Sequence, residues 1–246
     1  MKTSTSNTFT VVVPAAGAGK RMLSDCPKQY LMIGNECVLT HTINNLLSHP
    51  LINEVVVALS EKDEYFNELA LAKNPRVHKV IGGAERVNSV LKGLLSKHVV
   101  QNTWVLVHDA ARPCVSHKDI TALIELCTLN NCGGLLAIPV VDTIKQSNEI
   151  IQCNKSPNTK PTQVDKTIDR AALWQALTPQ MFKTNQLIHA IEAALEQSLD
   201  ITDESSAIEM AKIPSILVMG SRQNIKITRP DDLPLAAFYL ENRTHE

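Results

Sequence analysis

The sequence of 246 residues lacks a strong charge of either sign, a long apolar run and closely paired cysteines. Its formal net charge is −1, which argues against a surface built for nucleic acid or for an anionic membrane. No apolar run is long enough to span a bilayer, and the opening segment MKTSTSNTFT has no apolar core of a secretory signal. We therefore expect no membrane and no nucleic acid among the partners of this chain.

The cysteines exclude the common cysteine-based frameworks. None of them forms a C-x-x-C pair, and most stand inside apolar segments, which favours reduced thiols in a cytoplasmic protein over a zinc site or a disulfide scaffold. They are Cys26, Cys37, Cys114, Cys127, Cys132 and Cys153.

A glycine-containing loop follows the first apolar run, in VVVPAAGAGKRMLSDCPKQYL (Val11–Leu31). Both common phosphate-binding templates fail there. Pro14 stands where a P-loop has its first glycine and Arg21 where it has Ser or Thr, and Met22 stands where a dinucleotide fingerprint has its third glycine. Gly17 and Gly19 still allow backbone N–H groups to approach an anion. The cations that could neutralise such an anion are Lys20, Arg21 and Lys28.

Apolar runs rich in β-branched residues alternate with helical patterns along the chain, which predicts an α/β fold. Near-continuous apolar strands of this kind belong to a mostly parallel, twisted sheet of Rossmann type with helices on both faces. We expect strands at 10–15, 52–60, 77–83, 104–113, 133–140, 215–220 and 224–228. We expect helices at 39–49, 63–73, 85–98, 116–130, 184–199, 203–211 and 231–243.

This alternation breaks at about 141–169, where polar residues and two prolines leave too little apolar surface for a core. We interpret this segment as an arm or hairpin that projects from a single domain spanning 1–246. A projecting arm usually needs a surface to lie on.

Asp109 follows four apolar residues in WVLVHDAARP, so its carboxylate emerges at the tip of a buried strand. Ligands of open α/β sheets bind beyond such carboxyl ends, and a carboxylate there suits Mg²⁺ held together with substrate phosphates. The structural alternative is an aspartate that caps the turn after the strand, with Arg112 close by and His108 as a hydrogen-bonded core histidine.

Three other polar positions have an ordinary structural interpretation when each is taken alone. Thr202, followed by two acids, is typical of a helix N-cap. Thr178 begins a turn with Pro179, and Lys226 is an exposed strand lysine. Together with the loop and Asp109, however, they place cations and a carboxylate at strand ends, as phosphoryl or nucleotidyl transfer requires.

Seven motifs in order span nearly the whole chain, and together they resemble the 2-C-methyl-D-erythritol 4-phosphate cytidylyltransferase family, which has a fold like that of the nucleotide-diphospho-sugar transferases. They are PAAGAGKRM, CPKQYL, GGAERVNSV, VHDAARP, DRAALWQALTPQ, TDESSAIE and NIKIT followed by Pro230. The resemblance implies that CTP and a methylerythritol phosphate react to give a diphosphocytidyl product and pyrophosphate, in the non-mevalonate route to isoprenoids, with Mg²⁺ on the triphosphate.

The resemblance also implies a role for each matched residue. The implied catalytic cations are Arg21, Lys28, Arg170 and Lys226. The implied cytidine-binding set is Ala15, Ala16, Gly17, Gly83, Ser89 and Ala110. The implied sugar-phosphate side is Asp109, Arg112, Thr143, Thr178 and Thr202, with Asp109 also on the metal. In this family the arm clasps a second subunit, so the resemblance implies a homodimer in which Thr143 and Arg170 reach the partner's site.

Two features depart from the family pattern. The stretch between Asp142 and Asp169 is longer than expected, which predicts a longer hairpin tip at CNKSPNTKPT, and Ala84 stands where an acid is common. Two other functions stay open on the sequence: a cytidylyltransferase acting on ribitol 5-phosphate, and a non-catalytic nucleotide-binding module on the same fold.

Overall fold

A computed structural model describes residues 8–17, 26–101, 103–148 and 162–243 of the chain. A seven-stranded sheet lies at its centre, in the order β11-β7-β10-β6-β1-β4-β5. All neighbouring strands in it run parallel, except that β10 runs antiparallel to β6 and β7. The strands are β1 (Phe9–Pro14), β4 (Ile52–Leu59), β5 (Val77–Ile81), β6 (Trp104–Val107), β7 (Gly133–Pro139), β10 (Trp174–Lys183) and β11 (Ser215–Met219). The predicted α/β fold with a mostly parallel sheet is confirmed.

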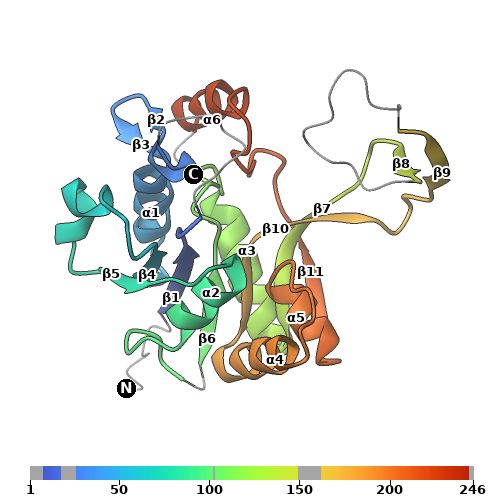
Figure 1. Ribbon diagram of the computed structural model, residues 1–246, viewed down its shortest axis with the longest axis horizontal. Coiled ribbons are helices and arrows are strands. Elements are labelled where there is room, and N and C mark those ends of the chain that lie inside the picture. Colours follow the sequence, from blue (N-terminus) through green and yellow to red (C-terminus); the bar gives the residue numbers. More distant parts are fainter. Residues whose placement is uncertain (1–7, 18–25, 102, 149–161, 244–246) are drawn as a thin grey trace.

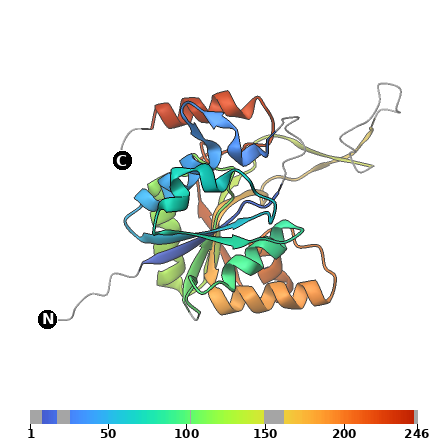
Figure 2. The same cartoon turned by 60° about the vertical axis from the view of Figure 1, so that its left-hand side comes forward.

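Helices cover both faces of this sheet, as Figures 1 and 2 show. They are α1 (Val38–Ser48), α2 (Arg86–Leu94), α3 (His117–Asn130), α4 (Thr184–Glu196) and α5 (Glu204–Met210). The last helix, α6 (Asp232–Glu241), lies instead beside the small hairpin of β2 (Met32–Ile33) and β3 (Glu36–Cys37), with an apolar cluster of its own. The strands have one apolar cluster on each face, because successive residues of a strand point to opposite faces. Each helix in the described residues is too short or too polar to cross a bilayer.

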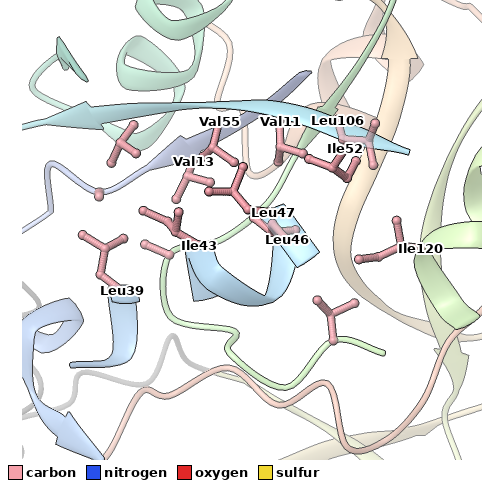
Figure 3. Packing of buried hydrophobic residues seen from close by; sticks show 14 of the residues in the cluster. Val11, Val13, Leu39, Ile43, Leu46, Leu47, Ile52, Val55, Leu106 and Ile120 are labelled. Carbon is pink, nitrogen blue, oxygen red and sulfur yellow. The ribbon is translucent and has the colours of Figure 1, made fainter. Parts of the chain in front are cut away.

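The first cluster fills the face covered by α1 and α3. Val11 and Val13 of β1 pack there against Ile43 of α1 and Ile120 of α3, all fully buried, as Figure 3 shows. The second cluster fills the opposite face, where Val12 and its neighbours pack against α2, α4 and α5. This continuous apolar burial keeps the strands straight and fixes where each one ends.

The chain reverses its direction of travel across the sheet next to β1. It proceeds from β1 to β4 and β5 on one side, and then crosses to β6 on the other side. In a parallel sheet, the loops that leave two such strands part in opposite directions and leave a crevice at their carboxyl ends. The loops after Pro14 and Val107 border this crevice.

The segment after β7 forms the projecting hairpin that the sequence predicts. Strands β8 (Ile144–Ser147) and β9 (Val164–Ile168) pair antiparallel in a sheet of their own. Figures 1 and 2 show this hairpin extending away from the main sheet. The expected long tip falls mostly on residues 149–161, which lie outside the described residues.

The prediction of one helix over 63–73 is wrong. The segment forms two short 3-10 helices, Phe66–Glu68 and Ala70–Lys73, separated by Leu69 in an extended conformation. The apolar anchors Phe66 and Leu71 both lie in the core, and their spacing of five residues does not place them on one face of an α-helix.

The turn predicted at Thr178-Pro179 is also wrong, because both residues lie inside β10, joined by a cis peptide bond. The pairing of β10 with β7 is irregular between Ala176 and Gln180. Proline is tolerated in a strand at such an irregularity, where no ladder N–H is required. The expected strand at 224–228 does not form either: this described stretch is irregular, and a hydrogen bond from the Ile227 amide to the Ala111 carbonyl (2.9 Å) holds it in place.

Candidate active site

A pocket of about 340 Å³ opens at the crevice beyond β1 and β6. The loop after β1, the loop between β5 and α2, and the loop after β6 form its walls. All six residues of the expected cytidine-binding set line it: Ala15, Ala16, Gly17, Gly83, Ser89 and Ala110. Lys28, Asp109 and Lys226 line it as well. The structure thus brings together nine residues that the resemblance had placed in one site.

Asp109 is the centre of the charge network in this pocket. Arg86 Nε lies 3.0 Å from its Oδ1, while Lys226 Nζ and Arg112 Nε lie 2.8 and 3.4 Å from its Oδ2. Burial alone would raise the pKa of this carboxyl, but Arg86, Lys226 and Arg112 outweigh it and hold the pKa well below its usual range. Asp109 is therefore ionised at any pH at which the protein works.

Arg86 is held from its other side by Glu204, at the start of α5. Arg86 Nη1 and Nη2 donate to the two oxygens of Glu204 at 2.6 and 3.0 Å, a bidentate pair. Burial would lower the pKa of Arg86, but the carboxylates of Glu204 and Asp109 raise it overall. The three cations of the network outnumber its two carboxylates and leave a net charge of +1, while Lys28 and Glu85, which also line the pocket, offset each other. Such a pocket favours a polyanion.

Arg112 and Thr178 lie behind Asp109, where both are buried. Arg112 Nη1 donates to the Asn224 carbonyl at 2.7 Å, and Asn224 Nδ2 donates to the Thr178 carbonyl at 2.7 Å. These bonds tie the end of β6, the middle of β10 and the 224–228 segment to one another. The expected contact of Arg112 and Thr178 with substrate stays a prediction, and in this structure their contacts position Asp109 and the neighbouring backbone.

A hydrogen-bonded chain through His108 fixes the backbone of Asp109. The Asp109 amide donates to Thr178 Oγ1, which lies 3.0 Å from His108 Nδ1. His108 Nε2 lies 3.0 Å from the Arg112 carbonyl, which can only accept. Burial lowers the pKa of His108 to about 4, so at neutral pH its ring is neutral, with the proton on Nε2. Thr178 Oγ1 then donates to Nδ1, and His108 has the structural role expected for it.

Lys28 reaches the pocket from a short 3-10 helix, Lys28–Tyr30. Gln29 Nε2 donates to the Ala15 carbonyl at 2.8 Å, and the buried Tyr30 donates through its hydroxyl to Asp63 Oδ2 at 2.7 Å. Lys28 Nζ donates to the Ile227 carbonyl at 3.4 Å, beside Lys226. The helix therefore connects the glycine loop to the 224–228 segment and brings two lysines to one wall.

The loop between β5 and α2 closes the pocket because it carries two glycines. A Cβ on Gly82 would lie 2.8 Å from Ala16 Cβ, and a Cβ on Gly83 would lie 2.3 Å from Asn88 Cβ. Any larger residue would force these loops apart. The Gly83 amide donates to Ser89 Oγ at 3.0 Å, and Ser89 Oγ donates to the Glu85 carbonyl at 3.1 Å. Ser89 thereby shapes the wall that it lines.

Three expected site residues lie elsewhere among the described residues. Thr202 is exposed just before α5, and its predicted N-cap role is wrong: Asp203 is the N-cap, because its side chain accepts from the Ser206 amide at 2.9 Å. Thr143 and Arg170 are exposed at the base of the hairpin, where Arg170 donates to the Val141 carbonyl. Arg21, with Gly19 and Lys20, falls within 18–25, outside the described residues.

The sequence interpretation missed Arg86 and Glu204. Both stand in motifs that were recognised, but Arg86 was not singled out within its predicted helix, and Glu204 was interpreted as an acid that complements the dipole of α5. Their partnership joins positions 118 apart in the chain. Glu204 has no cationic neighbour within α5, but this signal alone is too weak to reveal a distant partner.

Comparison with known proteins places these features in a family. A sequence model described as IspD, 2-C-methyl-D-erythritol 4-phosphate cytidylyltransferase, matches residues 9–242. The chain is 56% identical to the protein of that name from Colwellia psychrerythraea over 237 residues, covering 96% of each chain. It is 52% identical to the one from Vibrio vulnificus, covering 93% of each.

Solved structures give the same result. The chain superimposes on the crystal structure of 4-diphosphocytidyl-2C-methyl-D-erythritol synthase with a TM-score of 0.78 at 31% identity, covering 95% of this chain and 99% of the other. For 2-C-methyl-D-erythritol 4-phosphate cytidylyltransferase of Francisella tularensis the TM-score is 0.76 at 34% identity, with 94% and 99% covered.

We predict that Glu204→Gln destabilises the protein by about 3 kcal/mol, because Glu204 is 2% exposed and its loss of charge leaves a largely buried guanidinium with one partner fewer. Urea unfolding at pH 7 measures the change. Glu196→Gln, on the exposed face of α4, is the matched control and should stay within about 0.5 kcal/mol of the parent. Equal stability of the two variants would show that the pair with Arg86 contributes nothing.

Proposed function

Because this chain belongs to the 2-C-methyl-D-erythritol 4-phosphate cytidylyltransferase family, we propose that it transfers the cytidylyl group of CTP to 2-C-methyl-D-erythritol 4-phosphate. An oxygen of the sugar phosphate attacks the α-phosphorus of CTP, and the bond from that phosphorus to the bridging oxygen of the β-phosphate breaks. The products are 4-diphosphocytidyl-2-C-methyl-D-erythritol and pyrophosphate, in the non-mevalonate synthesis of isoprenoids. The chain is thus a nucleotidyltransferase.

The observation that carries the proposal is the cationic pocket at the strand switch point. Small side chains and backbone groups form part of its lining, which suits a planar base and a ribose, and Lys28 and Lys226 line the same pocket. Transfer at phosphorus needs positioned cations more than it needs covalent chemistry, because charge builds up on the phosphoryl oxygens in the transition state. We assign Lys28 and Lys226 to that charge, together with Arg21 from the loop after Gly17.

Asp109 is suited to be the single protein ligand of a Mg²⁺ ion. Among the described residues, Oδ1 faces one cation, Arg86, and Oδ2 faces two, Lys226 and Arg112, so we assign the ion to Oδ1. A site with one carboxylate is typical of Mg²⁺ that takes its remaining ligands from substrate phosphates and water. When bound, the ion supplies neutralising charge to the triphosphate. Arg86, Arg112 and Lys226 keep Asp109 ionised, and the ion would share its carboxylate with these three cations.

We also propose that the active unit is a homodimer formed through the hairpin. Thr143 and Arg170 stand at its base, away from the pocket of their own chain. Val164 on the hairpin is 64% exposed and Trp174 at its return is 37% exposed, which is apolar surface that a second subunit would cover. Arg170 would then hold the attacking phosphate in the partner's pocket.

A cytoplasmic location completes the proposal. Three of the described cysteines, Cys37, Cys114 and Cys127, are buried thiols outside any disulfide. Thiols of this kind suit a reducing compartment.

The substrate is tested by pyrophosphate release from the purified chain with CTP and Mg²⁺. We expect release with 2-C-methyl-D-erythritol 4-phosphate and none above background with ribitol 5-phosphate. Release with ribitol 5-phosphate alone would move the sugar side of the proposal to another polyol. Binding of CTP without release from either would indicate a nucleotide-binding module in place of an enzyme.

We predict that Lys28→Ala lowers kcat about 10²–10³-fold while the thermal midpoint stays unchanged, because one preorganised cation at the α-phosphate is lost. Steady-state kinetics with saturating CTP measures this change. Lys118→Ala, on the exposed first turn of α3, is the control and should keep full activity. A loss of less than about fivefold in Lys28→Ala would remove Lys28 from the transition state.

The shared site is tested by mixing inactive variants. If Arg170 acts in the partner's pocket, Arg170→Ala and Lys28→Ala chains should complement each other and regain roughly a quarter of parental activity after random exchange, since half of the dimers are hybrids with one intact site. Lys28→Ala mixed with Lys226→Ala is the control, because both residues line one pocket and no hybrid has an intact site. Absence of rescue, with exchange shown by differently tagged chains, would show that the site is not shared.

A further inference from the structure

Two histidines and a glutamate meet on the sheet edge opposite the pocket. Glu54 is near the start of β4, His78 is the second residue of β5, and His98 stands on the turn that follows α2. The pocket lies beyond the carboxyl ends of the strands, whereas Glu54 and His78 lie near their amino ends. This cluster is therefore separate from the residues assigned to cytidylyl transfer.

The three side chains are close enough to share one ion. Glu54 Oε2 lies 3.2 Å from His78 Nε2, and one ligand atom from each of the three residues lies within 4.8 Å of the others. The imidazoles of His78 and His98 stack with their centroids 3.5 Å apart and their planes 6° apart. Glu54 and His78 are partly buried, with side chains 32% and 19% exposed.

An unsatisfied atom points to a missing ligand. His78 Nε2 is buried and makes no hydrogen bond with the described residues, although Glu54 Oε2 lies 3.2 Å away. A buried imidazole nitrogen without a partner is rare in folded proteins, because its desolvation is not compensated. A cation placed between this nitrogen and the carboxylate would satisfy both.

The ligand types of Glu54, His78 and His98 indicate which class of ion they would bind. Two imidazoles and one carboxylate are the ligands of zinc-type ions, and with Zn–N distances of 2.0–2.1 Å, neighbouring ligand atoms lie about 3.4 Å apart. Glu54 and His78 already have that separation.

The imidazole of His98 has to rotate before all three residues can bind one ion. In the stack, the nitrogen lone pairs of the two rings lie in parallel planes and cannot point at one ion. His98 therefore has to rotate out of the stack to bind the ion through a nitrogen. Its backbone is fixed, since its amide donates to Ser96 Oγ at 3.3 Å and the next residue, Val99, is in the core. The side chain itself stands on a turn at the surface, where such a rotation is allowed.

We propose that Glu54, His78 and His98 form a binding site for a zinc-type divalent ion, with a further coordination position taken by water. The ion would join β4, β5 and the turn after α2. Because the first residue of α2 is Arg86, the site lies at the far end of the helix that supports the nucleotide pocket.

The test is a calorimetric titration of the untagged full-length chain with Zn²⁺, without nucleotide. We expect one Zn²⁺ per chain, with affinity weakened at least about tenfold in His98→Gln and in Glu54→Gln, since loss of a ligand costs at least as much as loss of its supporting partner. His189→Gln, on the exposed face of α4, is the control and should bind as the parent does. Absence of Zn²⁺ binding, or equal binding by all variants, would overturn the proposal.

A spectrum of the Co²⁺-loaded parent gives a second readout that needs no variant. We expect visible bands of four- or five-coordinate Co²⁺ without the near-ultraviolet band of a cobalt–thiolate bond, because the site has nitrogen and oxygen ligands only. A thiolate band would assign the ion to a cysteine and contradict the proposal.

Discussion

One buried carboxylate organises the pocket of this protein. Asp109 attracts Arg86, Arg112 and Lys226 from three separate segments of the chain. Arg86 is held a second time by Glu204, and Arg112 by the Asn224 carbonyl. Removing a charge from water is costly, and the attraction offsets this cost only when every partner is well placed. The geometry of the walls therefore depends on Asp109 remaining ionised, which its three neighbours ensure.

The same ion pairs meet two opposing requirements of the pocket, a positive charge and ordered loops. A pocket for a triphosphate has to be cationic, yet unpaired cations would repel one another and disorder the loops that carry them. Two internal carboxylates, Asp109 and Glu204, hold Arg86 in place and leave only a small excess of positive charge in the network. Lys226, which belongs to this network, and Lys28 both line the pocket that a ligand would enter.

Local sequence patterns were enough to predict six of the seven strands of the main sheet, the crevice at their carboxyl ends and the place of Asp109, because these follow from apolar runs that end at polar residues. The bond of Arg86 to Glu204 and the N-cap role of Asp203 were not predictable in this way. The first joins residues 118 positions apart, and the second depends on which of two adjacent side chains turns toward the Ser206 amide. Strand β10 was missed because Pro179 suggested a turn, while burial between two neighbouring strands overrides that local preference.

Strand β10 connects the hairpin to the pocket. Trp174, at its start, receives the chain from the hairpin, and Thr178, four residues on, holds the Asp109 amide through its hydroxyl. At roughly 3.3 Å per residue, about 13 Å of strand separates the two points. Pairing with β7 supports the first three residues of this stretch, Trp174 to Ala176. The hairpin and Asp109 are therefore joined by one strand and by one hydrogen bond at its end, so a partner that moves the hairpin also acts on the backbone of the residue at the centre of the pocket.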